Sequence, residues 1–388
     1  MSVPVLEELL AEPVDAARTR ADSAWPAFAH GRPVVLYGAG GVGRRVVAAL
    51  RDTGEPPVCF ADRSAAAGVE LDGIPVLDLA TAARQYGRDA VWVVTMLNPR
   101  HAFTAVRASL QAERVTTVVS WIPLAWVHAD ALLPYYAVDR PEHVLEQADD
   151  VRAAAALLED DASRDQYARQ VAWRLTADFD VLGPPLPACE QYFTPGVVPP
   201  RDDERFVDCG AFDGDTLESF LGHRRGRFDR YLALEPDAAN LAALRARVEG
   251  LAPDVRDRVE VLPYAAAAVP GTLRFAAGGG SSAGLSQTGE VEVPAIVLDD
   301  LLGDVVPTYV KMDIEGAEPA ALAGTAATVA RDRPVLALCA YHVQDHLWRL
   351  ALALDALVDD YAYFLRRYEN DCWEVVLYAV PRERLATL

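Results

Sequence analysis

Lysine is almost absent from the 388-residue sequence, in which Lys311 is the only lysine among 36 basic residues. Positive charge is scarce as well, since 57 acidic residues leave a formal net charge of −21. Such an acidic chain repels phosphate backbones and anionic lipid, so we expect neither nucleic acid nor a membrane as partner. The single lysine is either a chance survivor or a position that needs a compact ammonium group.

Paired cysteines and long apolar runs are also missing. The five cysteines are scattered and form no CxxC pair, which favours a reducing compartment and argues against a zinc knuckle. The first ten residues, MSVPVLEELL, lack the basic region of a signal peptide. No uncharged apolar run approaches the ~18–20 residues that a membrane span needs. We therefore expect a cytoplasmic protein.

Strand and helix patterns alternate in residues 1–128, which predicts a parallel sheet. A buried run at residues 34–36 leads into a GxGxxG turn at Gly38, Gly40 and Gly43, and a helix with one apolar face follows. The sequence therefore predicts a Rossmann-like N-terminal domain. At ~100–200 residues per domain, the chain has room for a second domain.

Residues 129–200 are helical by period and then rich in proline, so we interpret them as a helical connector. The strand–turn–helix pattern restarts in residues 201–388. Its last strand patterns, at 361–368 and 372–381, alternate as an antiparallel closing pair. The predicted fold class is α/β with two Rossmann-like doubly wound sheets, the second mostly parallel.

The first glycine turn is a candidate ligand site because its backbone N–H groups can approach a phosphate at a helix N-terminus. Asp62 follows Gly43 at a spacing where an acid can meet a ribose hydroxyl. Three alternatives stay open. The first is that Gly38–Gly43 bind a nucleotide or nucleotide-sugar, and the second is that they bind a nicotinamide cofactor. The third is that the glycines serve only the packing of the helix against the strand.

A second glycine turn, VDCGAFDGDT at residues 207–216, points to a different ligand. Gly210 and Gly214 free the backbone, and Glu235 ends the next strand, where its two oxygens can accept both hydroxyls of a ribose. The acids around the turn suit a cationic ligand and would repel a pyrophosphate. These features predict S-adenosylmethionine, which has an amino group, a sulfonium and no phosphate. Capping of the next helix is the alternative for Asp213 and Asp215.

Five segments resemble the FkbM-type methyltransferase family in order and spacing. They are VDCGAFDGDT, LALEPD, VKMDIEGAEPAAL, AYHVQDHLW and YFLRRYENDCWEVVLYAVP, within residues 185–382. The resemblance implies a class I methyltransferase fold, S-adenosylmethionine as methyl donor with S-adenosylhomocysteine as product, and O-methylation of a sugar, glycan or natural product. The cofactor-binding residues that it implies are Asp208, Gly210, Ala211, Phe212, Asp213, Gly214, Thr216, Glu235, Tyr264 and Ala265.

Catalytic candidates lie at the ends of two later strands, where open α/β sheets bind their ligands. His342 is predicted as the general base that takes a hydroxyl proton, and Asp313 as second candidate or as its orienter. Lys311 would stabilise Asp313 or an oxyanion. A purely structural histidine is the alternative for His342. Helix capping or Mg²⁺ coordination is the alternative for Asp313 and Glu315, and no metal site is predicted.

The sequence thus predicts an S-adenosylmethionine-dependent methyltransferase that acts on a small-molecule or sugar-bearing acceptor. Two other function classes stay open. One is a nicotinamide-dependent oxidoreductase that uses the first glycine turn. The other is a module that binds a nucleotide or S-adenosylmethionine without catalysis.

Overall fold

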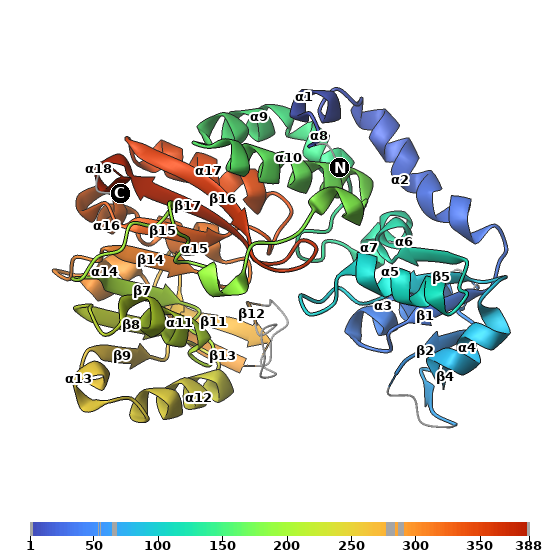
Figure 1. The fold of residues 1–388 in the computed structure, drawn as a ribbon, viewed down its shortest axis with the longest axis horizontal. Helices are drawn as coiled ribbons and strands as arrows, with labels where there is room; N and C mark the ends of the chain where they lie inside the picture. The colour runs from blue at the N-terminus through green and yellow to red at the C-terminus, as the bar shows by residue number, and fades with distance from the viewer. Residues whose placement is uncertain are drawn as a thin grey trace.

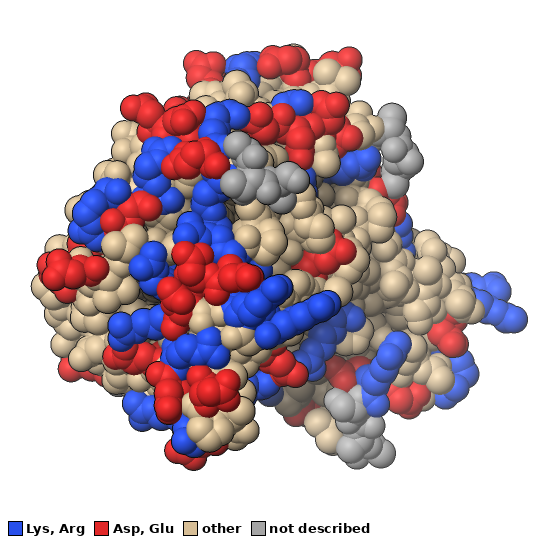
Figure 2. Space-filling view, turned by 60° about the vertical axis from the view of Figure 1, so that its left-hand side comes forward, with Lys and Arg blue, Asp and Glu red and all other residues tan. Residues whose placement is uncertain are grey.

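The computed structural model describes residues 3–52, 54, 56–63, 68–276, 284–285 and 291–385. Two α/β units stand side by side, and a group of helices lies above them (Figure 1). Acidic and basic side chains intermingle over the face in Figure 2 rather than gathering by sign. None of the helices in those ranges is both long enough and apolar enough to cross a bilayer.

The N-terminal unit is a six-stranded sheet in the order β3-β4-β2-β1-β5-β6. Its neighbouring strands are parallel except β3 and β4. The strands are β1 (Val34–Tyr37), β2 (Cys59–Ala61), β3 (Glu70–Leu71), β4 (Ile74–Leu77), β5 (Val91–Val94) and β6 (Thr117–Ser120). The crossing helices are α3 (Gly41–Asp52), α4 (Leu79–Tyr86) and α5 (Phe103–Ala112). The order reverses between β1 and β5, as in a Rossmann-like sheet.

Further helices come from both sides of this sheet in the sequence, and some of them form the upper group in Figure 1. These further helices are α1 (Leu6–Leu9), α2 (Val14–Ala29), α6 (Ile122–Val127), α7 (Ala129–Leu132), α8 (Glu142–Glu146), α9 (Ala148–Leu157) and α10 (Asp161–Thr176). Two short 3-10 turns follow, η1 (Phe179–Leu182) and η2 (Ala188–Glu190). The connector is fixed to the second unit, because Asp160 pairs with Arg366 at 2.6 Å and Ser163 accepts the Leu365 N–H at 3.0 Å.

The second unit is a seven-stranded sheet in the order β16-β17-β15-β14-β7-β8-β9. The strands are β7 (Arg205–Cys209), β8 (Arg230–Leu234), β9 (Val259–Leu262), β14 (Tyr309–Met312), β15 (Val335–Cys339), β16 (Tyr361–Arg367) and β17 (Val375–Pro381). Only β17 runs against its neighbours, so the predicted parallel sheet with an antiparallel closing pair is confirmed. The central strands β7 and β14 are buried on both faces and are mainly apolar, with Asp208 and Lys311 as the buried charged residues within them.

Helices flank this sheet. They are α11 (Asp215–Arg224), α12 (Ala238–Glu249), α13 (Pro253–Arg256), α14 (Leu298–Leu302), α15 (Glu318–Ala323), α16 (Ala326–Asp332), α17 (His346–Leu357) and α18 (Arg382–Leu385). A smaller sheet beside it holds β10 (Ala265–Ala266), β11 (Gly271–Ala276), β12 (Gly284–Leu285) and β13 (Val291–Ile296). In this smaller sheet, β11 pairs with β13 in antiparallel register.

The strand order of the second sheet reverses between β7 and β14, and a crevice is expected at their carboxyl ends. Gly210 follows β7 with a φ of +81°, a conformation that side chains rarely adopt. A Cβ atom at this position would lie 1.9 Å from the backbone oxygen of Asp313, which follows β14. Only glycine therefore allows the two strand ends to approach this closely.

Replacement of Gly210 by alanine tests this constraint. We expect Gly210→Ala to lower the free energy of unfolding by about 1–3 kcal/mol, because the backbone of Asp313 must move to admit the methyl group. Gly222→Ala is the matched control, since Gly222 lies within α11 and a Cβ atom there meets nothing within 4 Å. That variant should be unchanged or more stable by about 0.5–1 kcal/mol in urea unfolding. Equal stability of the two variants would contradict the close approach.

Candidate active site

A cavity of about 970 Å³ lies at the carboxyl end of the second sheet. All three parts of the chain supply its walls. The N-terminal unit gives residues 97–100 after β5, and the connector gives Tyr135, Tyr136, Ala188, Cys189, Gln191 and Tyr192. The remaining lining residues come from the second unit. The site is therefore not contained in one domain, although its floor is the crevice between β7 and β14.

Six of the predicted cofactor-binding residues line this cavity. They are Gly210, Phe212, Thr216, Glu235, Tyr264 and Ala265. Glu235 is held rigidly, because its two carboxylate oxygens accept the N–H groups of Phe212 at 2.9 Å and Asp237 at 2.8 Å. Burial raises the pKa of Glu235 to about 7. Each oxygen keeps a further lone pair for a ligand hydroxyl.

The other four predicted cofactor residues do not line the cavity and belong to the strand end and turn next to it. Asp208 and Ala211 are fully buried. The Asp213 carboxylate lies 3.7 Å from the Arg247 guanidinium. Gly214 takes a φ of +94° at the start of α11, so glycine itself, and not Asp213, occupies the capping position. Asp215, in contrast, lines the cavity and accepts the Thr216 N–H at 2.6 Å.

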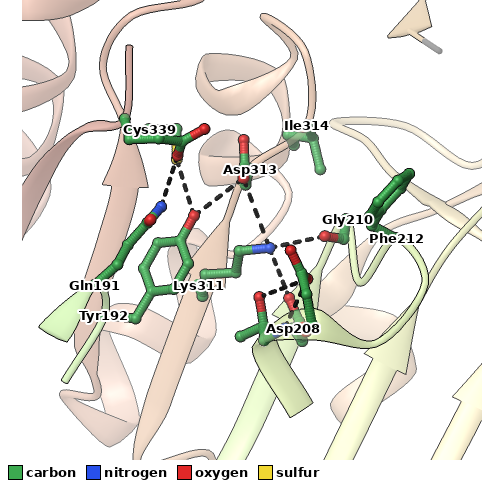
Figure 3. Close-up of polar contacts among 12 residues, drawn as sticks. Gln191, Tyr192, Asp208, Gly210, Phe212, Lys311, Asp313, Ile314 and Cys339 are labelled. Atoms are coloured by element: carbon green, nitrogen blue, oxygen red, sulfur yellow. Dashed lines mark hydrogen bonds and ion pairs between the residues drawn. The ribbon is translucent and has the colours of Figure 1, made fainter. Parts of the chain in front are cut away.

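The ammonium group of Lys311 lies at the centre of the crevice (Figure 3). It is 2.9 Å from the Asp208 carboxylate, donates to the Gly210 carbonyl at 2.7 Å, and lies 4.0 Å from Asp313. Burial opposes its charge, but the carboxylates of Asp208 and Asp313 prevail and raise the pKa of Lys311 above its ordinary value. The side chain therefore remains a cation that ties β14 to β7.

The Asp313 carboxylate faces the cavity beside this cation. The Tyr192 hydroxyl donates to it at 3.0 Å (Figure 3), and the Tyr341 hydroxyl, which is closer to Glu374 at 3.1 Å, lies 3.4 Å from it. Burial and the nearby Asp313 carboxylate raise the pKa of Tyr192, so its phenol stays neutral and acts as a donor. The carboxylate is thus oriented by the Tyr192 hydroxyl and has lone pairs left for an acceptor group.

His342 has a different environment from the one predicted for a general base. Its side chain is 1 % exposed, with Nδ1 2.7 Å from Glu318 and Nε2 3.3 Å from Asp313. Burial acts to lower the pKa of His342, but the carboxylates of Glu318, Asp313 and Glu315 raise it to about 10. A raised pKa disfavours proton uptake at neutral pH, because little of the imidazole is then neutral. This environment favours a positioning role towards Asp313 over the general-base role that the sequence predicts for His342, and the base role stays a prediction.

The protein-family comparison finds a match in the second unit. Residues 208–368 match the family described as Methyltransferase FkbM domain. The matched range covers less than half of the chain. The matched range includes Gly210, Glu235, Lys311 and Asp313, and it ends at residue 368, within the last of the segments that resemble the family.

Solved structures show the same fold. The crystal structure of methyltransferase FkbM from Methylobacillus flagellatus KT is 22% identical, covers 97% of this chain and 99% of its own, and has a TM-score of 0.79. This likeness confirms the predicted class I methyltransferase fold.

Two further solved structures are more distant. An rRNA methylase from Streptococcus thermophilus is 13% identical, covers 46% of this chain and 88% of its own, and has a TM-score of 0.29. The glycopeptide N-methyltransferase MtfA, complexed with S-adenosyl-L-homocysteine, is 13% identical, covers 46% and 82%, and has a TM-score of 0.26. Scores this low imply nothing further. A comparison with curated proteins found no match.

Several residues around the cavity, among them Tyr136, Tyr192 and Glu374, escaped sequence reasoning. Thirteen non-glycine residues in the described part of the chain have positive φ, and five of them line the cavity. These five are Tyr136, Tyr192, Phe212, Glu315 and Glu374. Each such conformation costs about 1–3 kcal/mol and tends to occur at functional sites. Glu374 lies in a segment that resembles the family, whereas the connector tyrosines carry no motif that could have indicated them.

Three side chains in the methyltransferase domain could offer ligand atoms to a metal. Oxygen or sulfur atoms of Asp313, Cys339 and Glu374 lie within 4.8 Å of one another. However, Tyr192 already contacts both Asp313 and the Cys339 sulfur, and the Lys311 cation lies close by. Burial raises the pKa of the Cys339 thiol well above its ordinary value, so no thiolate is available. We propose no metal site here.

The first glycine turn, outside the methyltransferase domain, fits close packing. A Cβ atom at Gly43 would lie 2.4 Å from the Gly38 carbonyl oxygen, and one at Gly38 would lie 2.8 Å from Met96. The Ala39 N–H donates to the Asp62 carboxylate at 3.0 Å, which places an anion within the turn. Binding of a nucleotide or nucleotide-sugar at Gly38–Gly43 stays a prediction.

The ion pair between His342 and Glu318 predicts a pH-dependent stability. The pKa of His342 is raised from 6.5 to about 10, so its contribution is fully present below pH 6.5 and is lost as pH rises through about 10. The difference in unfolding free energy between wild type and His342→Gln should therefore shrink from neutral pH towards pH 10. Urea unfolding across that range measures it. A difference that stays constant with pH would show that His342 is uncharged in the folded protein.

Proposed function

We propose that the protein transfers a methyl group from S-adenosylmethionine to a hydroxyl of a sugar, glycan or natural product. One observation carries the proposal: the rigid Glu235 carboxylate and the Gly210 turn face the same cavity of a methyltransferase domain. The proposal makes the protein an enzyme and assigns no metal to it. A cytoplasmic location is part of the same proposal.

The charge of the cavity fits this cofactor. Seven acidic residues line it, against two basic ones, Arg100 and Lys311. The cation of Lys311 is already opposed by the buried carboxylate of Asp208. Such a lining disfavours a pyrophosphate and favours a cationic, phosphate-free ligand. The cofactor, when bound, supplies a methyl group on a positively charged sulfur.

The residues divide between holding the cofactor and handling the acceptor. Glu235 would accept the ribose hydroxyls, and Tyr264 and Ala265 would lie beside the adenine. Asp313 would accept the proton of the acceptor hydroxyl, because its carboxylate faces the cavity and is oriented by Tyr192. Lys311 and His342 would hold Asp313 in place from behind. Enclosure by the connector and residues 97–100 would limit access of water.

Binding and activity measurements distinguish the proposed methyltransferase from the two other function classes. A nicotinamide-dependent oxidoreductase would gain thermal stability from NAD(H), whereas the proposed enzyme gains it from S-adenosylhomocysteine. A non-catalytic module would bind S-adenosylhomocysteine and transfer no methyl group to any acceptor. The cavity position favours the methyltransferase, because it lies at the second sheet rather than at Gly38–Gly43.

Cofactor binding should depend on Glu235. Because each charge-assisted hydrogen bond contributes ~1.5–3 kcal/mol, Glu235→Ala should weaken S-adenosylhomocysteine binding by about tenfold or more in calorimetry. Glu260→Ala is the control, since Glu260 is an exposed acid one strand away that pairs with Arg230. It should bind normally. Unchanged affinity in folded Glu235→Ala would refute the cofactor assignment.

Proton removal should depend on Asp313. A positioned base contributes about 10²–10⁴-fold, so Asp313→Asn should lower kcat by at least a hundredfold. The S-adenosylhomocysteine affinity should change by no more than about threefold, because the base acts mainly in the transition state. His342→Gln should reduce kcat less, since it only positions Asp313. A larger loss in His342→Gln than in Asp313→Asn would reverse the two roles.

A further inference from the structure

One wall of the cavity is built from acids and aromatic rings. It comprises Tyr136, Glu315, Tyr341, Trp373 and Glu374, which we call the acidic–aromatic wall. The rings contact one another, with centroids 4.9 Å apart for Tyr136 and Trp373 and 5.6 Å apart for Tyr341 and Trp373. Tyr341 and Trp373 adjoin β15 and β17, whereas Glu235 and Tyr264 adjoin β8 and β9. The wall therefore lies on the opposite side of β14 from the proposed cofactor site.

Neither acid of this wall has a lysine or arginine partner among the residues described, and burial raises the pKa of each acid more than the attraction of His342 lowers it. In the ranges that the structure describes, no lysine or arginine nitrogen lies within 4.0 Å of the carboxylates of Glu315 or Glu374, whereas Asp208 and Asp313 share Lys311. Glu374 accepts from Tyr341 at 3.1 Å and from Gln191 at 2.6 Å, both of them neutral donors. Burial raises the pKa of both glutamates to about 7, which shows that the protein alone does little to stabilise their charge. A cationic ligand would supply what is missing.

The aromatic part of the wall suits the same ligand. The faces of tyrosine and tryptophan rings attract a cation within about 6 Å. Trp373 is only 8% exposed, and its Nε1–H has no hydrogen-bond partner among the described residues. This indole N–H is enclosed by protein and is a donor like an ammonium group, so the contribution of Trp373 is its ring face. Aromatic rings next to two acids that have no lysine or arginine partner within the described ranges are typical of a binding site for a compact polar cation.

We propose that the acidic–aromatic wall binds a protonated amine of the methyl acceptor, so that the substrate is an amine-bearing polyol such as an amino sugar. This inference rests on the proposed function, in which a hydroxyl of the same acceptor meets Asp313. Glu315 and Glu374 recognise the ammonium group, and the rings of Tyr136, Tyr341 and Trp373 cover it. Acceptors with a carboxylate or phosphate at this position are repelled.

Binding of three sugars of matched shape tests the inference. The protein is saturated with S-adenosylhomocysteine and titrated with 2-amino-2-deoxyglucose, glucose and glucuronate, which carry positive, neutral and negative charge. Tryptophan fluorescence and saturation-transfer NMR report binding. We expect the amine to bind about tenfold more tightly than glucose, and glucuronate to bind more weakly than either, as charge-assisted hydrogen bonds imply.

Isosteric variants locate the preference. Glu315→Gln and Glu374→Gln keep the shape and the positive φ but remove the charge, so each should reduce the preference for the amine to about threefold or less. Asp360→Asn is the matched control, because Asp360 is an exposed acid with positive φ, and it should retain the full preference.

The outcomes separate this inference from the proposed function. Failure of S-adenosylhomocysteine to bind would refute the cofactor assignment. Normal cofactor binding with equal affinity for glucose and the amine, or with no binding of the amine up to its solubility limit, would refute the amine site alone. A preference that survives both glutamine substitutions would place the amine elsewhere.

Discussion

A buried ammonium group holds together the part of the second sheet on which the site depends. Lys311 comes from β14, and its charge is opposed by Asp208 of the adjacent strand β7. These are the strands between which the order of the sheet reverses, so their carboxyl ends must separate to form a crevice. The lysine crosses that crevice at its floor and also holds the Gly210 carbonyl. The turn at Gly210, which lines the cavity, is thereby attached to the central strand of the sheet.

The position of Lys311 divides the acids of the cavity into those that pair with it and those that do not. Close to Lys311, the carboxylates of Asp208 and Asp313 are compensated. Further along the wall, Glu315 and Glu374 are partly buried beside aromatic rings and neutral donors. Burial of uncompensated acids is unfavourable, as is the positive φ that both residues adopt. Unfavourable terms that gather around one cavity indicate that binding, rather than stability, determined these positions.

The connector turns two α/β units into one site. Its helices are fixed to β16, and its tyrosines line the cavity beside residues 97–100 of the N-terminal unit. The N-terminal unit thus reaches the cavity through residues 97–100, which follow β5, and not through its own glycine turn at Gly38–Gly43. The contact of Asp371 with the Phe103 N–H, at 3.1 Å, fixes this approach.

The sequence by itself determined the periodic features of the protein. Apolar runs, glycine turns and acids at strand ends indicated both sheets, the antiparallel closing pair and the position of Glu235, because these depend on residues close together in the chain. His342 shows the limit: its place at a strand end was evident, but its protonation depends on Glu318 and Asp313, which only packing brings within 3.3 Å. Tertiary structure alone decided the composition of the acidic–aromatic wall, since Tyr136, Glu315 and Glu374 come from separate segments of the chain. Their meeting depends on how the connector packs, and no local pattern encodes it.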